Sequence, residues 1–261
     1  MPIPMLTPDK NPQENAARDG GSPASRKTGE YGSRGDYHRD ISPDWSYYPL
    51  YLSKKKFVLD FISAYPRETS IVDVGCGEGV FVEELAKRGY VRVLGVDDNY
   101  SSDIVVRGSV LALPIEDERY DVAFFLDVIE HIPIERQADA IRELLRVLKP
   151  GGSLVISIPN LAHLASRVRF LLKGKFVRTA SVEKHPGDRP IAEYMKMLEE
   201  GGFLLAERKG FFPTVPVLYK LVQRKPSRYL WLYDLLNRLL PNANWCFLNI
   251  LVCRKGGGRA A

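Results

Sequence analysis

The chain has 261 residues, of which 45% are hydrophobic, and this length and composition are typical of one packed domain with appendages. Its formal net charge of +5 is only a mild excess, so we expect no nucleic-acid partner from charge alone. Because residues 1–30 lack a signal-peptide core, no uncharged run could cross a bilayer, and the three cysteines lack metal-ligand spacing, we expect a cytoplasmic protein with no transmembrane segment.

The N-terminal segment differs in composition from the rest of the chain. Residues 1–40 are rich in Pro, Gly, Ser, Asn and charged residues, which predicts a disordered leader or a lid over a ligand. The apolar spacing over residues 50–64 then predicts a helix. With residues 257–261 as a flexible tail, we expect a single domain over residues 41–256.

Strands and helices alternate through the middle of the chain. Strands are predicted at 71–75, 91–97, 104–106, 120–126, 153–158, 203–211 and 245–253, and helices at 79–89, 134–148 and 190–200. Pro150-Gly151-Gly152 is expected to end the second of these helices. Such alternation predicts a parallel sheet with helices on both faces, which is an α/β fold.

A glycine-rich turn follows the first predicted strand. The segment is Ile71-Val72-Asp73-Val74-Gly75-Cys76-Gly77-Glu78-Gly79, and a second acid, Asp97, ends the next strand. Glycines let the backbone approach a nucleotide-type cofactor, and an acid in the second position can accept hydrogen bonds from ribose hydroxyls. Dehydrogenases share this layout. Asp73, however, would repel a pyrophosphate, whereas it suits a cofactor with an ammonium and a sulfonium group.

Three later motifs narrow the family. They are Leu113-Pro114, the run 120–131 (YDVAFFLDVIEH) and the run 145–152 (LRVLKPGG). In this order the motifs resemble class I S-adenosylmethionine-dependent methyltransferases, and within them the small-molecule (type 11) group that includes ubiquinone-biosynthesis O-methyltransferases. The resemblance spans roughly residues 50–210. It implies S-adenosylmethionine as the cofactor and a Rossmann-like, doubly wound, mostly parallel seven-stranded sheet with an antiparallel last strand.

The resemblance also implies which residues hold the cofactor. The glycine loop, with Cys76 inside it, would line the methionine end, and Asp97 would bind the ribose beside Asp98. Ser109 and Val110 would flank the adenine, and Leu126 and Asp127 would lie beside the sulfonium. The implied set is Asp73, Gly75, Cys76, Gly77, Asp97, Asp98, Ser109, Val110, Leu126 and Asp127. Asp97 as a helix cap and Ser109 as a plain turn residue are the structural alternatives.

Asp127, Glu130 and His131 suggest chemistry beyond cofactor binding. On a helix they would share one face, and two carboxylates with an imidazole could hold a divalent metal. Some relatives use an acid-x-x-Glu-His arrangement in this way, although they usually begin with Glu rather than the shorter Asp. His163 could add a ligand. Alternatively, His131 acts as a base or substrate contact, or has a structural role.

Two insertions follow strands, where substrate-binding loops of open α/β sheets belong. The first, 160–188, is basic, and Arg167 and Arg169 could grip an acidic or glycan-linked acceptor; His163 and His185 are further candidate substrate contacts. A solvated basic face is the alternative. The second, 213–244, includes the apolar run 229–240, which could cap a hydrophobic acceptor, rest peripherally on a membrane, or pack on the sheet.

These features favour methyl transfer to a small molecule, at oxygen, with a sugar-linked, lipid-linked or secondary-metabolite acceptor. An RNA or nucleotide methyltransferase is the first alternative, but the Asn/Asp-Pro-Pro-aromatic motif of base-modifying enzymes is absent, with Leu126-Asp127-Val128-Ile129 in its place. A non-catalytic S-adenosylmethionine-binding module is the second alternative.

Overall fold

A single seven-stranded sheet organises residues 41–178 and 182–256, which are the residues that the computed structural model describes. The strands lie in the order β3-β2-β1-β4-β5-β7-β6. Their bounds are β1 (Ser70–Val74), β2 (Arg92–Asp97), β3 (Val105–Arg107), β4 (Tyr120–Phe125), β5 (Leu148–Pro159), β6 (Phe203–Pro213) and β7 (Cys246–Lys255). The predicted leader 1–40 and tail 257–261 lie outside the described residues.

The sheet is parallel from β3 to β5, and β7 inserts antiparallel between β5 and β6. β1 is buried along its whole length, as a central strand covered on both faces should be. The sheet therefore confirms the predicted Rossmann-like α/β class with an antiparallel last strand. The carboxyl ends of β1, β2 and β4 lie at the same edge of the sheet, so the residues that follow these strands come together there.

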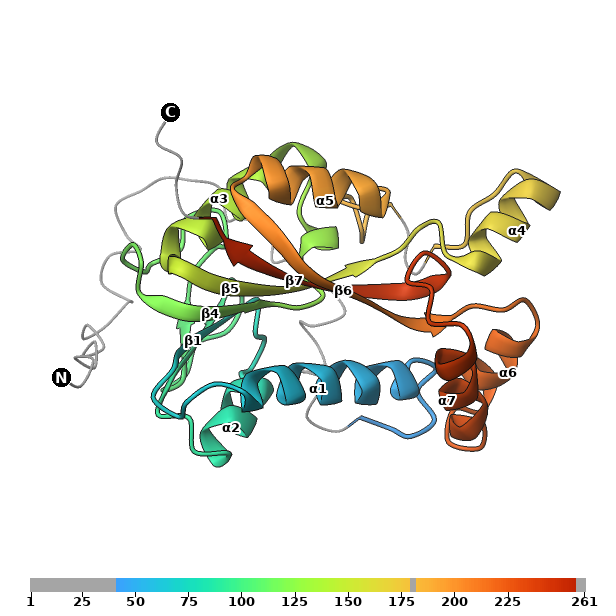
Figure 1. Cartoon of the computed structure of the whole chain (residues 1–261), viewed down its shortest axis with the longest axis horizontal. Coiled ribbons are helices and arrows are strands. Elements are labelled where there is room, and N and C mark those ends of the chain that lie inside the picture. The colour runs from blue at the N-terminus through green and yellow to red at the C-terminus, as the bar shows by residue number, and fades with distance from the viewer. Residues whose placement is uncertain (1–40, 179–181, 257–261) are drawn as a thin grey trace, which may run out of the picture. The chain divides into compact units, whose positions relative to one another are not determined.

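Helices cover both faces of this sheet, as Figure 1 shows: α3 and α5 lie on one face, and α1, α2 and α7 on the other. The bounds are α1 (Tyr48–Ser63), α2 (Val80–Lys87), α3 (Gln137–Val147), α4 (Leu164–Lys173), α5 (Ile191–Glu200), α6 (Leu218–Arg224) and α7 (Leu230–Leu239), with 3₁₀ turns η1 (Ile129–His131) and η2 (Ile134–Arg136). No helix in the described part of the chain is both long and apolar enough to cross a membrane.

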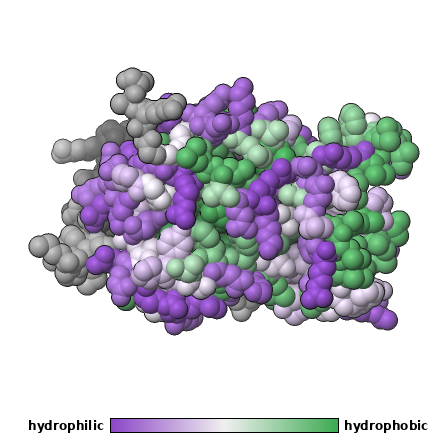
Figure 2. Space-filling model, viewed as in Figure 1, coloured by the Kyte–Doolittle hydropathy of each residue, from purple (hydrophilic) through white to green (hydrophobic). Residues whose placement is uncertain are grey.

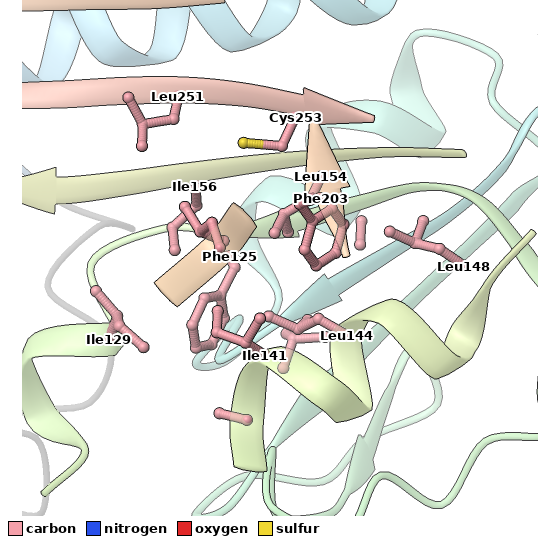
Figure 3. Close-up of a cluster of buried hydrophobic side chains, with 14 of the residues drawn as sticks. Phe125, Ile129, Ile141, Leu144, Leu148, Leu154, Ile156, Phe203, Leu251 and Cys253 are labelled. Carbon is pink, nitrogen blue, oxygen red and sulfur yellow. The ribbon is translucent and has the colours of Figure 1, made fainter. Parts of the chain in front are cut away.

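Each face of the sheet has its own hydrophobic core. Adjacent residues on a strand point to opposite faces, so Phe125 packs with Ile141 and Leu144 of α3, while Phe124 joins the cluster on the α1 side. Figure 3 shows the first of these cores, with side chains of β4, β5 and β7 over α3. These cores hold the strand ends in place around the site.

Three details differ from the prediction. The helix expected from 134 begins as the 3₁₀ turn η2, and α3 starts at Gln137. Pro150-Gly151-Gly152 does not end that helix, because α3 already ends at Val147. The motif lies within β5, at a register shift opposite β4. The two insertions are not only loops, because α4 lies in 160–188 and both α6 and α7 lie in 213–244.

Candidate active site

The glycine loop between β1 and α2 is built from left-handed backbone. Gly75, Gly77 and Gly79 have φ angles of 77°, 58° and 84°, which side-chain-bearing residues seldom adopt. A Cβ on Gly75 would also lie 2.3 Å from Cγ2 of Val128. The loop therefore requires glycine, and its backbone can lie close to a bound ligand.

Asp97 docks against this loop from the end of β2. Its Oδ2 accepts a hydrogen bond from the backbone N–H of Gly77 at 2.9 Å, and its Oδ1 accepts one from the N–H of Asn99 at 2.8 Å. Because α2 begins at Val80 with Gly79 as its N-cap, Asp97 is not a cap of that helix. A carboxylate has about four lone-pair positions, so two backbone bonds leave acceptor capacity for a ligand's hydroxyls.

The other candidates in this region differ in exposure. Asp73 is buried within β1, whereas Asp98 is exposed and its carbonyl oxygen accepts a hydrogen bond from Arg107. Cys76 is buried and packs under the loop, where a Cβ on Gly95 would lie 2.6 Å from its Sγ. The Cys76 side chain therefore faces the core, which leaves its backbone as the part that can meet a ligand.

Ser109 and Val110 form a turn after β3. The Ser109 hydroxyl oxygen accepts a hydrogen bond from the N–H of Leu111 at 3.3 Å, and Ser109 forms a β-bridge with Ala112. Val110 packs against the core on the α3 side. Ser109 is thus a turn residue in this structure, and its hydroxyl oxygen keeps one further lone pair for a ligand.

Asp127 follows β4 in a strained, left-handed conformation, with φ of 58°. Ser157 of β5 holds it twice: the hydroxyl oxygen accepts from the Asp127 N–H at 2.7 Å, and the hydroxyl donates to Oδ1 at 2.7 Å. The Lys54 ammonium of α1 pairs with Oδ2. These contacts fix the Asp127 carboxylate between β5 and α1, beside the predicted sulfonium-binding Leu126.

The prediction that Asp127, Glu130 and His131 share one face of a helix is wrong. Asp127 precedes η1 in left-handed backbone, and only Glu130 and His131 belong to the 3₁₀ turn. The structure instead brings Glu130 and His131 together with His185. Each of these three offers one ligand atom, and the three atoms lie within 4.8 Å of one another. His185, predicted only as a substrate contact, replaces Asp127 in the group.

The two imidazoles of this group differ in their surroundings. Nδ1 of His131 lies 3.0 Å from the carbonyl oxygen of Lys184. Because a carbonyl only accepts, Nδ1 must hold the proton, which leaves the Nε2 lone pair of His131 for another partner. The His185 ring lies edge-on to His131 at 4.7 Å. Burial, followed by the neighbouring His131, lowers the pKa of His185 to about 4, so His185 is neutral at pH 7.

Glu130 is the buried member of the group. Burial first, and then the Asp127 carboxylate, raises the pKa of Glu130 well above its ordinary value. Its Oε2 is buried without a hydrogen-bonding partner among the described residues. A buried carboxyl group near two imidazoles fits the ligand set of a divalent transition metal better than that of magnesium, which prefers oxygen alone.

A buried polar clamp, which the sequence analysis missed, holds the His185 loop against η1. Nε2 of Gln137 donates to the carbonyl oxygens of Ile129 and Gly187 at 2.9 and 2.8 Å, and the Tyr194 hydroxyl donates to Gly187 at 2.6 Å. A Cβ on Gly187 would lie 2.2 Å from the carbonyl oxygen of Ile132. Pro186-Gly187 was the only visible signal, since Gln137 lies on an ordinary amphipathic helix.

His163 has a structural position rather than a place in this group. It is buried as the N-cap of α4, where its Nδ1 accepts from the N–H of Ser166 at 3.3 Å and lies 2.7 Å from Oγ1 of Thr214. Burial lowers the pKa of His163 to about 4. His163 therefore caps α4, and the structure does not bring it into the group of Glu130, His131 and His185.

Arg167 and Arg169 are exposed on α4, which projects from the sheet in Figure 1. Nε of Arg167 donates to the carbonyl oxygen of Ala162 at 2.5 Å. The structure thus places both guanidinium groups on a projecting helix and not in the Glu130–His131–His185 group.

Known proteins resemble this chain in sequence. The family model of a methyltransferase domain matches residues 72–156, which include the glycine loop, Asp97 and η1. A probable S-adenosylmethionine-dependent methyltransferase of Mycolicibacterium smegmatis is 31% identical over 54% of this chain and 54% of its own length, so the chain spans about half of that relative. A ubiquinone biosynthesis O-methyltransferase of Neisseria meningitidis is 29% identical over 66% of this chain and 81% of its own length.

Solved structures share the fold at lower identity. The crystal structure of the [4+2]-cyclase SpnF has a TM-score of 0.52 and 18% identity, and the match covers 78% of this chain and 81% of that one. A methyltransferase from Methanosarcina mazei that depends on S-adenosylmethionine has a TM-score of 0.51 and 18% identity, with 76% and 97% coverage. At such identities these structures show the fold alone.

Proposed function

We infer that this chain, which belongs to the S-adenosylmethionine-dependent methyltransferases, transfers the methyl group of that cofactor to an oxygen atom of a small molecule. The observation that supports cofactor binding most directly is the Asp97 carboxylate, which is buried and fixed to the glycine loop through Gly77. Such a carboxylate accepts charge-assisted hydrogen bonds from the two ribose hydroxyls.

The remaining parts of the cofactor are assigned to residues in and near the glycine loop. We assign its methionine end to Asp73, Gly75 and Gly77, and its sulfonium to the neighbourhood of Leu126 and Asp127. When bound, S-adenosylmethionine supplies a methyl group already activated by positive sulfur. The protein then has to hold donor and acceptor in line. Ordered residues at the ends of the strands can provide this positioning.

His131 is the residue we assign to the acceptor. Its Nδ1 proton is committed to the Lys184 carbonyl, so the Nε2 lone pair can take the proton of an acceptor hydroxyl. The acceptor oxygen then forms its bond to the methyl carbon as the carbon–sulfur bond breaks towards sulfur. The proton stays on Nε2 of His131 until it is released to solvent, which balances the step.

The same group would hold a divalent metal through Glu130, His131 and His185, where a bound metal would polarise the acceptor oxygen as a Lewis acid. A chelator separates the two roles. Transfer that persists in the chelator assigns His131 the role of base, whereas transfer that is lost and returns with Mn²⁺ assigns the three side chains to a metal.

Sugar-linked, lipid-linked and secondary-metabolite hydroxyls are the acceptor classes we propose. The ubiquinone biosynthesis O-methyltransferases among the relatives support oxygen as the acceptor atom, at 25% to 31% identity. We also propose a cytoplasmic location, because the buried Cys246 and Cys253 are thiols that form no disulfide in the described part of the chain, as expected in a reducing compartment.

The decisive experiment starts with calorimetric titration of S-adenosylhomocysteine and of NADH into the full chain. Binding of the homocysteine product alone is expected, and binding of NADH alone would overturn the proposal. Because one structure of this fold is a [4+2]-cyclase, transfer of labelled methyl must then be measured directly on hydroxylated acceptors and on RNA. Labelled RNA would change the acceptor class, and binding without transfer would indicate a non-catalytic module.

A further inference from the structure

Exposed apolar side chains are concentrated in the two insertions. Of the fourteen large hydrophobic side chains exposed in the described residues, nine lie in 160–188 and 213–244. On α4, Leu171 and Leu172 are 84% and 73% exposed, and on α7, Trp231 and Leu239 are 61% and 67% exposed. Figure 2 shows hydrophobic colour at the end of the molecule where α4 and the α6–α7 pair lie.

The two insertions share one base. The Thr214 hydroxyl oxygen accepts a hydrogen bond from the N–H of Ala165 at 3.0 Å, and the N–H of Leu164 donates to the carbonyl oxygen of Trp245 at 3.2 Å. The start of α4 is therefore tied to both ends of the second insertion. Both helical projections leave the sheet at this common point (Figure 1), so both can meet one extended surface at the same time.

The charge of this region is strongly one-sided. Segments 160–178 and 214–245 contain ten basic residues, all of them exposed, and one acid, Asp234. The basic residues are Arg167, Arg169, Lys173, Lys175, Arg178, Lys220, Arg224, Lys225, Arg228 and Arg238. The two segments thus have a net charge of +9 within a chain of net +5. The full insertions 160–188 and 213–244 have a net charge of +8, because 179–188 adds Lys184, Glu183 and Asp188, of which Asp188 pairs with Arg178.

We propose that this insertion surface, formed by the exposed apolar residues Leu171, Leu172, Trp231 and Leu239 and the ten basic residues, docks on an anionic lipid bilayer. Leucine and tryptophan side chains enter the boundary between headgroups and acyl chains, while long basic side chains reach back to lipid phosphates. The proposal does not rest on the methyl-transfer assignment.

Two other occupants match the surface less well. A nucleic acid would use the basic side chains but would leave the exposed leucines of α4 in water, since single strands favour stacking on aromatic rings. A second copy of the chain would bring two surfaces of net +9 together, which repel each other. An anionic bilayer would bury the exposed leucine side chains and pair the basic side chains with lipid phosphates at the same time.

The test is co-sedimentation of the full chain with vesicles of phosphatidylglycerol and phosphatidylcholine, compared with pure phosphatidylcholine. We expect at least tenfold tighter partitioning to the anionic vesicles, and a steep loss of binding with added salt. Equal partitioning to both vesicle types, or none to either, would overturn the proposal.

Variants locate the contact. Leu171→Asp with Leu172→Asp should reduce partitioning at least tenfold, and Arg169→Gln with Lys173→Gln should reduce it by on the order of fivefold for each charge removed. The matched controls are Val91→Asp, at a residue 73% exposed outside the insertions, and Lys196→Gln on α5, whose side chain is 75% exposed. Both controls should bind like the parent.

Two results would contradict the bilayer proposal and assign the insertion surface to another partner. A parent chain that sediments as a dimer in solution, and that Leu171→Asp with Leu172→Asp makes monomeric without changing vesicle binding, would assign the surface to a second copy. Binding to single-stranded RNA with vesicle partitioning unchanged by either pair of substitutions would assign it to nucleic acid. A thermal melt of each variant confirms that lost partitioning does not reflect unfolding.

Discussion

The ammonium group of Lys54 on α1 is paired with the carboxylate of Asp127, which lies 73 residues later at the end of β4. The lysine side chain is 11% exposed and the aspartate side chain 32% exposed, so each charge depends on the other for compensation. The pair ties the helix that precedes the sheet to the strand end where we place the sulfonium.

Lys54→Met should destabilise the protein by about 1–3 kcal/mol, because it leaves the half-buried Asp127 carboxylate without its cation. Combining it with Asp127→Asn should recover part of that loss, since both charges are then gone. Urea unfolding measures both values. Lys56→Met is the matched control: it breaks the pair with Asp60 on the same helix, whose side chains are 75% and 64% exposed, and should cost under about 0.5 kcal/mol. A double variant no more stable than the single one would contradict the pairing argument.

Asp97→Ala should weaken S-adenosylhomocysteine binding by about 1–3 kcal/mol, which is roughly 5- to 150-fold in dissociation constant. The loss combines the ribose contacts with loosening of the loop at Gly77. Calorimetry measures the change, and Asp103→Ala at an exposed position serves as the control. Unchanged affinity in Asp97→Ala would mean that the ribose site lies elsewhere.

His131→Ala should lower the rate of methyl transfer by on the order of 100-fold while the affinity for S-adenosylhomocysteine changes little, because a general base acts on the acceptor and not on the cofactor. Single-turnover rates and calorimetry provide the two readouts. An equal loss of rate and cofactor affinity would instead assign His131 a structural role.

Gly187→Ala should displace the His185 loop, since the added Cβ would lie 2.2 Å from a carbonyl oxygen and 2.4 Å from Nε2 of Gln137. We expect a loss of roughly 2 kcal/mol or more in unfolding free energy together with lower transfer rates. Gly174→Ala is the control: its φ of 62° makes a side chain strained, but no atom lies within 4 Å of the new Cβ, so about 1 kcal/mol is expected without an effect on rate. Equal rates in the two variants would show that the clamp does not position the site.

The stability of the protein should fall as the pH falls from about 6.5 towards 4, because His163 is buried and neutral. Its pKa is about 4 in the fold against an ordinary 6.5, so the unfolded chain binds the extra proton in this window. The contribution between pH 7 and pH 4.5 is on the order of 2 kcal/mol. His163→Asn retains a capping side chain and removes this titration, so its unfolding free energy should depend less on pH. Identical pH slopes for variant and parent would remove His163 as the cause.

The strands could be predicted because the sequence pattern that marks each strand lies within the strand itself. Ile71, Val72 and Val74 are apolar residues of a fully buried strand, and the glycines after it are needed for positive φ, so the β1–loop–α2 unit could be predicted from its own residues. Asp97 ends the next strand, and because the carboxyl ends of parallel strands lie at one edge of the sheet, its place beside the glycine loop could also be predicted.

The proposed catalytic group of Glu130, His131 and His185 depends on contacts between segments that are far apart in the sequence. His131 and His185 are 54 residues apart, and the contacts of Gln137 and Gly187 help to hold their two loops together. The spacing of Asp127, Glu130 and His131 suggested a helix, whereas Ser157 and Lys54 hold Asp127 in left-handed backbone before a 3₁₀ turn. Tertiary contacts decided the conformation there, against the helical spacing.

The place of β7 in the sheet has a consequence for synthesis on the ribosome. Among the strands that the structure describes, β6 joins the rest of the sheet only through β7, which is later in the chain than both of its neighbours. Until residues 246–255 have left the exit tunnel, β5 and β6 each present an unpaired edge that could recruit another nascent chain. The growing polypeptide must therefore keep about a hundred residues beyond β5 from aggregating, and the arrival of one strand then closes both edges at once.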